Sequence, residues 1–453
     1  MSPMADLSIK YNKAIPRYTS YPTVPHWKLQ NPDQAEWLRE VRNVYFSQKD
    51  KSISLYIHLP FCESLCTYCG CNKRITKNHS VEEQYIESVL SEWNIYVSAL
   101  GEKPIIRNIH LGGGTPTFFS SENLNKLLFS ILETSEIHPH KAFSFEGHPN
   151  NTTYEQLKIL AELGFDRVSY GVQDFNLKVQ KAIHRIQPIE NVRKTTEWAR
   201  ELGYESVNYD LIYGLPFQTL ENIEENIEKV REFKPERIAL YSYAHVPWKS
   251  KAQRGYGDDD LPKPEEKLAM YLRAKQMLNE MGYENIGMDH YALPQDELTI
   301  AKEKGYLNRN FMGYTTDQNQ MMIGLGCSAI SATGTAFVQN EKVVEKYQTT
   351  VLNNELPLII GHYLTEEEQI SAKLINQIIC NGSVDFKRST LAMQLWGEAQ
   401  DELAEMQKDG LLEMGDYALK VTEEGMLFVR NICSLFDPKL KQKSDKPQFS
   451  QSI

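Results

Sequence analysis

A run of ten residues, from Cys62 to Cys71, constrains this chain more than any other feature. It reads Cys-Glu-Ser-Leu-Cys-Thr-Tyr-Cys-Gly-Cys and holds four of the seven cysteines in the sequence. It follows an apolar segment that ends at Pro60, so we expect it to form the loop after a strand. Cysteines at such close spacing are typical of metal ligands, and the identity of the metal decides what the rest of the chain is for.

The first three cysteines of this loop, Cys62, Cys66 and Cys69, have the spacing C-x3-C-x2-C. Structural zinc sites usually draw on two separated pairs of ligands, and the sequence has no second pair. A disulfide is disfavoured because the composition indicates a reducing compartment. Iron–sulfur ligation by thiolates is therefore the natural interpretation. Three cysteines on a four-iron cluster would leave one iron open for chemistry, whereas Cys71 as a fourth ligand would give an ordinary electron-transfer cluster.

The composition is that of a globular protein, with 453 residues, 41% hydrophobic and 24% charged. A net charge of −11 argues against a broad nucleic-acid-binding surface. No apolar run approaches the roughly 18 residues of a membrane span, and residues 1–10 lack the apolar core of a signal peptide. We therefore expect a cytoplasmic protein without a membrane span. Because no coiled coil or exposed apolar stripe demands a partner, we expect a monomer.

From about residue 51 the pattern alternates between strands and helices. Apolar strands are predicted at 53–59, 105–111, 142–146, 166–173, 204–212 and 236–243, and capping residues at Ser80, Thr153 and Thr219 begin helices between them. Such alternation predicts parallel βαβ units and an α/β fold. A closed or partial (β/α) barrel fits, with a doubly wound open sheet as the alternative.

The pattern divides the chain into three parts. Residues 1–50 form an N-terminal arm, whose segment Pro-Arg-Tyr-Thr-Ser-Tyr-Pro at 16–22 is predicted to be extended. Residues 51–362 form the barrel, and residues 363–453 form a mainly helical domain with a hairpin near 411–422. Helices with a small hairpin resemble a winged helix, but without a basic stripe we expect a packing or lid role rather than DNA binding.

Polar residues gather where the predicted strands end. Gly112-Gly113-Gly114 follows one strand and would let the backbone approach a ligand closely. Glu146, Gln173 and Asp210 stand near the ends of three successive strands. Active sites of barrel folds lie at this rim, so we expect these side chains to surround a polar ligand beside the cysteine loop.

Several longer motifs resemble one family, the oxygen-independent coproporphyrinogen III oxidases of the radical S-adenosylmethionine (SAM) superfamily. Within the cysteine loop the similarity extends through Cys69-Gly70-Cys71-Asn72-Lys73. The other matching motifs are the arm at 16–22, His-x-Gly-Gly-Gly-Thr-Pro-Thr at 110–117, Gly-Val-Gln-Asp-Phe at 171–175, Asp-Leu-Ile-Tyr-Gly-Leu-Pro at 210–216, Tyr-Ala-His at 243–245, Gly-Met-Asp-His at 287–290 and Gly-Tyr-Thr-Thr at 313–316. The similarity runs over nearly the whole chain.

The resemblance implies a partial (β/α)6 barrel with a 4Fe–4S cluster on Cys62, Cys66 and Cys69 and with SAM on the open iron. It implies that Tyr56, Cys71 and Arg17 belong to the catalytic site, with Cys71 not a cluster ligand and Arg17 near a substrate carboxylate. Family members carry two SAM molecules, and the matching contact positions are Tyr56, Tyr68, Gly113, Gly114, Thr115, Glu146, Gln173, Arg185, Asp210, Ala244 and Ile330.

The activity implied by the resemblance is the conversion of two propionates of coproporphyrinogen III into vinyl groups, with a low-potential electron donor such as flavodoxin or ferredoxin as a partner. One departure is His148, where the family often has aspartate. Two alternatives are a heme chaperone and another radical SAM enzyme that modifies a tetrapyrrole. Chaperone relatives lack the arm motif and Cys71-Asn72-Lys73, and this chain has both.

Overall fold

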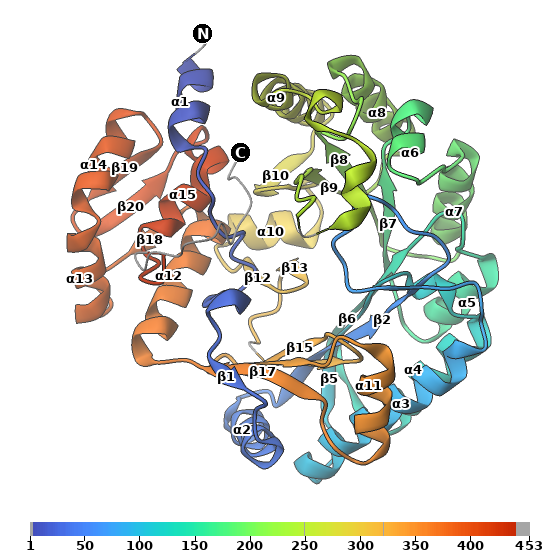
Figure 1. Ribbon diagram of the computed structural model, residues 1–453. Helices are drawn as coiled ribbons and strands as arrows, with labels where there is room; N and C mark the ends of the chain where they lie inside the picture. Colours follow the sequence, from blue (N-terminus) through green and yellow to red (C-terminus); the bar gives the residue numbers. More distant parts are fainter. Residues whose placement is uncertain (1–2, 249, 320, 441–453) are drawn as a thin grey trace.

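The computed structural model describes residues 3–248, 250–319 and 321–440. Its centre is a 13-stranded sheet in which six consecutive strands run parallel and curve into an open barrel (Figure 1). In spatial order these strands are β2 (Ser52–Leu59), β5 (Ile105–Gly113), β6 (Glu136–Gly147), β7 (Arg167–Gln173), β8 (Ser206–Tyr213) and β9 (Arg237–Ser242). Their order in the sheet equals their order in the chain, so the predicted partial (β/α)6 barrel is confirmed.

Helices cover the outer face of the parallel strands (Figure 1). They are α3 (Val81–Leu100), α4 (Ser121–Glu133), α5 (Tyr154–Glu162), α6 (Leu177–Ala182), α7 (Ile189–Glu201), α8 (Leu220–Phe233) and α9 (Pro264–Glu280). Thr153 and Thr219 form the predicted helix caps. The cap predicted at Ser80 is wrong, because Ser80 has a helical backbone conformation and makes no side-chain cap hydrogen bond. Near the start of α3, the Glu82 carboxylate accepts a hydrogen bond from Asn123 Nδ2 at 2.8 Å, and this bond connects α3 to α4.

Shorter strands extend the sheet on both sides of the barrel. Next to β2 lie β14 (Met322–Leu325), which is parallel to it, and then the antiparallel strands β15 (Ile330–Ala332), β16 (Ala336–Asn340), β17 (Leu358–Tyr363) and β1 (Leu29–Gln30). Next to β9 lie β11 (His290–Ala292) and β10 (Glu284–Gly287). The remaining elements here are α10 (Glu297–Glu303), the hairpin β12 (Asn308–Asn310) and β13 (Gly313–Thr315), and α11 (Val344–Leu352).

The N-terminal segment is part of the packing rather than a separate arm. It contains two helices, α1 (Pro3–Tyr11) and α2 (Gln34–Ser47), and α2 buries Trp37, Val41 and Tyr45 in the core of the barrel. Residues 16–22 form no helix, as predicted, but they are not extended throughout, because residues 19–22 form bends and Tyr18 has a φ of +48°. Their side chains Tyr18 and Tyr21 lie in a second core, together with the C-terminal elements.

The C-terminal elements pack beside the barrel opening (Figure 1). They are α12 (Glu366–Asn381), β18 (Ser383–Asp385), α13 (Thr390–Glu398), α14 (Gln400–Lys408), β19 (Leu412–Gly415), β20 (Ala418–Val421) and α15 (Val429–Ser434). The predicted hairpin is β19–β20, and residues 390–408 form two helices that meet at Ala399. The second core also takes in Ile286 and Leu298 of the barrel, so the boundaries at residues 50 and 362 stay a prediction. Within the described ranges, no helix is both long and apolar enough to cross a membrane.

A buried carboxyl group, Glu92 on α3, connects this helix to the residue that follows β14, to the end of β16 and to α11. It accepts hydrogen bonds from Gly326 N at 2.8 Å, Asn340 Nδ2 at 2.6 Å and the Tyr347 hydroxyl at 2.7 Å. Burial raises the pKa of Glu92 from 4.5 to about 7 in spite of these three donors. Above pH 4.5 the unfolded chain therefore loses a proton that the folded chain keeps until about pH 7.

We expect Glu92 to lower the free energy of unfolding by about 3 kcal/mol as the pH rises from about 4.5 to well above 7. A Glu92→Gln variant is neutral at every pH, so its unfolding free energy should fall less steeply over this window. Urea denaturation at several pH values measures both slopes. The exposed Glu355→Gln serves as the control and should keep the slope of the unsubstituted protein. Equal slopes for Glu92→Gln and the unsubstituted protein would contradict the assignment.

Candidate active site

The cysteine loop is closed at its base by a short ladder. Strand β3 (Phe61–Cys62) pairs with β4 (Arg74–Ile75), and the Thr76 amide donates to Cys62 O at 2.9 Å. In the middle of the loop, Thr67 N donates to Ile183 O at 3.0 Å. The loop therefore has a defined shape at the carboxyl end of β2, as the sequence predicted.

The four thiols of the loop differ in their surroundings. Cys66 is buried, Cys62 and Cys69 are half-buried, and Cys71 is exposed. Burial raises the pKa of the Cys62 thiol to about 11, whereas a hydrogen bond with Cys71 lowers the pKa of Cys69 to about 6. The Thr115 hydroxyl lies 3.2 Å from Cys62 Sγ. Cys71 is thus the most exposed residue of the four, although its thiol is hydrogen-bonded to that of Cys69.

These sulfur atoms line a cavity of about 270 Å³ at the rim of the barrel. Most of the residues expected from the sequence meet in it: Cys62, Cys66, Tyr68, Cys69, Cys71, Gly113, Gly114, Thr115, Glu146, Gln173, Arg185 and Asp210. Tyr241, Ser169 and His148 also line it. Ser169 and Tyr241 were missed, because only polar residues at the very ends of the predicted strands were considered.

Four expected site residues lie outside this lining. The Tyr56 hydroxyl is 3.0 Å from His58 Nδ1, and Ala244 is connected to Tyr68 because Gln253 Nε2 donates to both carbonyl groups. Ile330 packs against a small cluster around Trp27, Ala332 and Phe337.

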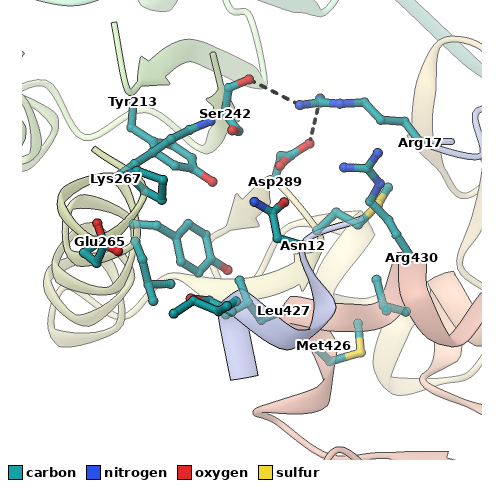
Figure 2. A pocket seen from close by; sticks show the side chains of 17 residues that line it. Asn12, Arg17, Tyr213, Ser242, Glu265, Lys267, Asp289, Met426, Leu427 and Arg430 are labelled. Carbon is teal, nitrogen blue, oxygen red and sulfur yellow. Dashed lines mark hydrogen bonds and ion pairs between the residues drawn. The ribbon is translucent and has the colours of Figure 1, made fainter. Parts of the chain in front are cut away.

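Arg17, the fourth, lies in a different pocket. Its guanidinium donates to Asp289 Oδ2 at 3.2 Å and to Ser242 O at 3.3 Å (Figure 2).

The glycine turn brings the backbone of β5 against the start of the cysteine loop. A Cβ atom on Gly114 would fall 2.5 Å from the carbonyl carbon and oxygen of Pro60. A Cβ atom on Gly113 would fall 2.7 Å from the His58 ring, and Gly113 has a φ of +115°. Gly113 N donates to Glu146 Oε2 at 3.2 Å. Glycine is therefore required at both positions by space and, at Gly113, also by conformation.

The polar wall of the cavity is built from neighbouring strand ends. Asp210 accepts from Ser169 Oγ at 3.1 Å and from Asn208 Nδ2 at 2.9 Å. Burial and the nearby charge of Glu146 raise the pKa of Asp210 to about 7. Burial also lowers the pKa of His148 well below its usual range, so this ring is neutral near pH 7.

Arg185 supplies the positive charge of the cavity. Nη1 donates to Cys66 Sγ at 3.6 Å, and Nη2 donates to the Gly171 carbonyl. Among the described residues, the buried Arg185 Nε has no hydrogen-bond partner. A buried donor of this kind suits a ligand with a carboxylate group.

The donor set fits an iron–sulfur cluster better than a single metal ion. Within the described part of the chain, no group of three or more histidine, cysteine or acidic side chains lies close enough to hold one ion. A four-iron cluster binds each thiolate on a different iron and therefore spaces its ligands more widely. The cavity beside Cys62, Cys66 and Cys69 offers that space, and Arg185 offsets thiolate charge. SAM also fits, because its carboxylate would meet the unsatisfied Arg185 Nε.

Comparisons with known proteins agree with this geometry. Residues 56–230 match the model of the radical SAM superfamily. The oxygen-independent coproporphyrinogen III oxidase of Pseudomonas aeruginosa is 38% identical and is covered over 98% of its length by 99% of this chain. The corresponding Escherichia coli protein is 37% identical, with 97% of its length and 98% of this chain covered.

The structure of the E. coli coproporphyrinogen III oxidase, described as a radical SAM enzyme, superposes with a TM-score of 0.88 at 35% identity, covering 94% of this chain and 100% of that chain. Similarity at this level spans the arm, the barrel and the C-terminal elements together. The chain therefore belongs to the oxygen-independent coproporphyrinogen III oxidase family of the radical SAM superfamily.

Proposed function

We propose that this protein converts coproporphyrinogen III into protoporphyrinogen IX without oxygen, by oxidative decarboxylation of two propionate side chains to vinyl groups. The observation that carries the proposal is the meeting of three sheltered cysteines with the glycine turn and the Glu146–Asp210 wall in one cavity. The full-length similarity to coproporphyrinogen III oxidases supports the same substrate.

We assign the 4Fe–4S cluster to Cys62, Cys66 and Cys69, with SAM beside it and a second SAM molecule in the same region. When bound, these groups supply one-electron cleavage of SAM to a 5′-deoxyadenosyl radical that removes a hydrogen atom from the substrate. The chain itself supplies positioning. Gly113 and Gly114 let a ligand approach the β5 backbone, and Arg185 holds a carboxylate through Nε.

The acidic groups of the cavity have a complementary role. Glu146 and Asp210 accept hydrogen bonds from hydroxyl and amino groups of a ligand, and Asp210 holds a proton in part near pH 7 because its pKa is about 7. The neutral His148 adds no positive charge beside Arg185.

An anaerobic assay tests the proposed function. Reconstituted protein is incubated with dithionite, SAM and coproporphyrinogen III, and the products CO2 and protoporphyrinogen IX are measured. The proposal is rejected if a protein with an intact cluster makes neither product. Binding of heme without turnover would instead favour a heme chaperone.

Cys71 provides a test of how the four loop cysteines divide their roles. Cys71 is the most exposed of the four residues, and its thiol is hydrogen-bonded to Cys69 in the same cavity. We propose that it acts beside the substrate and binds no iron. A Cys71→Ser variant should hold the same amount of iron and sulfide per chain as the unsubstituted protein, while its turnover falls by about 10²–10⁴-fold, as for loss of a proton-transferring group. Loss of the cluster from this variant would instead show that Cys71 is needed to hold the iron.

We also infer that a low-potential, acidic electron donor such as flavodoxin or ferredoxin reduces the cluster. The supporting observation is a group of basic side chains on two segments that contact the cysteine loop. Thr67 N donates to Ile183 O at the end of α6, and Gln253 of the 3-10 helix Lys251–Gly255 donates to Tyr68 O. These segments expose Lys178, Lys181, Lys251 and Arg254, and exposed carboxylates stand at Glu63 in the loop and at Asp258 and Asp259 after the second segment.

Charge reversal tests this docking surface. A Lys181→Glu, Lys251→Glu double variant should raise the KM for an acidic donor protein about tenfold, because charges at the edge of an interface control the rate at which the two proteins associate. Turnover with dithionite, a small reductant, should not change. Lys408→Glu on α14, which is also exposed, is the matched control. An unchanged KM for the donor protein would refute the docking surface.

We further propose that the protein is a cytoplasmic monomer.

A further inference from the structure

A second pocket lies where the N-terminal segment, the barrel and the C-terminal elements meet (Figure 2). Its volume is about 260 Å³, and it shares no lining residue with the cysteine cavity. Ser242 lines this pocket, whereas its neighbour Tyr241 lines the cysteine cavity. Successive residues of a strand point to opposite faces of a sheet, so the second pocket lies behind the barrel wall.

Three cationic side chains from three separate parts of the chain point into this pocket (Figure 2). Arg17 comes from the N-terminal segment, Lys267 from α9 and Arg430 from α15. Asp289 pairs with Arg17 at 3.2 Å. The other acidic lining residue, Glu265, is exposed at the mouth. The sheltered part of the pocket thus brings three positive charges together with one negative charge.

Backbone carbonyl groups take only part of the hydrogen-bonding capacity of Lys267 and Arg17. Lys267 Nζ donates to Tyr243 O at 2.9 Å, which uses one of its three protons. Arg430 is bound to the N-terminal segment, because Nε donates to Pro16 O at 3.0 Å and Nη2 donates to Ile15 O. Arg17 donates to Asp289 and to Ser242 O. Among the described residues, Lys267 and Arg17 therefore keep donors that a ligand in the pocket can use.

The three cations also repel one another in this shielded position. Burial, together with the charges of Arg17 and Arg430, lowers the pKa of Lys267 to about 8. Burial and the charge of Arg17 likewise lower the pKa of Arg430. A second negative charge in the pocket would relieve this repulsion, because opposite charges favour the charged form of each group.

We propose that this pocket is a binding site for an anion, whose carboxylate or phosphate group lies between Lys267 and Arg17, with the positive charge of Arg430 beside them. Guanidinium groups bind the oxygen atoms of both anions in pairs. The rings of Tyr213 and Tyr271 and the side chains of Met288 and Leu427 give the rest of the pocket an apolar lining for the ligand's carbon skeleton.

The size of the pocket restricts the ligand. Sites for drug-sized molecules measure roughly 300–1,000 Å³, so about 260 Å³ accepts a small carboxylate or phosphate compound, or one propionate arm of a tetrapyrrole, but not the macrocycle. The bound anion would bridge the N-terminal segment, α9 and α15, and should therefore stabilise the folded chain.

Thermal unfolding of the full chain tests the site. The probes are inorganic phosphate, citrate and coproporphyrin III, each compared with sodium chloride at the same ionic strength. We expect a saturable rise in Tm with at least one probe and a loss of at least tenfold in its affinity for Lys267→Gln. A response to phosphate or citrate identifies a free anion as the ligand, and a response to coproporphyrin III alone identifies a tetrapyrrole carboxylate.

Two control variants distinguish loss of the anion site from a general loss of structure. Lys267→Arg keeps the charge and should keep the response. Lys263→Gln, at the start of the same helix but outside the pocket, should respond like the unsubstituted protein. The proposal is overturned if no probe gives a saturable shift beyond chloride, or if Lys267→Gln responds with unchanged affinity. None of these measurements requires turnover, so they stand apart from the proposed function.

Discussion

Replacement of Cys66 by alanine is expected to abolish both the cluster and turnover. Cys66 is the buried member of the three cysteines that we propose as cluster ligands, and its sulfur accepts a hydrogen bond from Arg185 Nη1 at 3.6 Å. The variant removes one of these three thiolates. Because enzymes accelerate reactions by about 10⁶-fold or more, loss of the group that supplies the chemistry should lower turnover to background.

Iron and sulfide content per chain, measured after anaerobic reconstitution, reports the cluster separately from activity. The matched control is Cys380→Ala, which removes another buried thiol, in the core beside α12. This control should have a lower free energy of unfolding but the same iron content as the unsubstituted protein. A Cys66→Ala protein that holds a full four-iron cluster and turns over would refute the assignment of this residue as a ligand.

Replacement of Gly114 by alanine should have the second largest effect. The added Cβ would fall 2.5 Å from Pro60 C and O, and backbone atoms cannot rotate out of the way as a side chain can. The start of the cysteine loop must therefore move. Overpacking of this kind costs about 1–3 kcal/mol, and we expect SAM affinity to fall about 10–100-fold as the cavity wall shifts.

Isothermal titration of SAM into the reconstituted variant measures this loss, and circular dichroism checks the fold. Gly70→Ala is the control within the same loop, because a Cβ there would meet no atom within 4 Å. It should bind SAM as the unsubstituted protein does. Equal affinities for Gly114→Ala and Gly70→Ala would show that the close approach to Pro60 is not required.

Features with a short repeat along the chain were predictable from the sequence. The alternation of strands and helices fixes the barrel, and the parallel arrangement brings Glu146, Gln173 and Asp210 to one rim, where they line the cysteine cavity. Thr153 and Thr219 cap their helices because each partner lies only three residues away.

Features that depend on distant partners were not predictable. The cap expected at Ser80 is absent, and the Glu82 side chain is bound to Asn123 on the next helix. Arg17 pairs with Asp289, which is 272 residues further along the chain, and its expected place near a substrate carboxylate stays a prediction. The sequence gives no sign of such a pair, because a local pattern carries no information on which distant segments pack together.

The packing of residues 11–21 has a consequence for how the protein is made. The hydroxyl of Tyr18 donates to Asp437, 419 residues later, and Arg430 Nε donates to Pro16 O, 414 residues earlier in the chain. A ribosome therefore exposes this early segment long before its partners exist. The barrel strands can pair while synthesis continues, but the segment should reach its final place only after α15 has been released. The last folding step thus joins the two ends of the described chain.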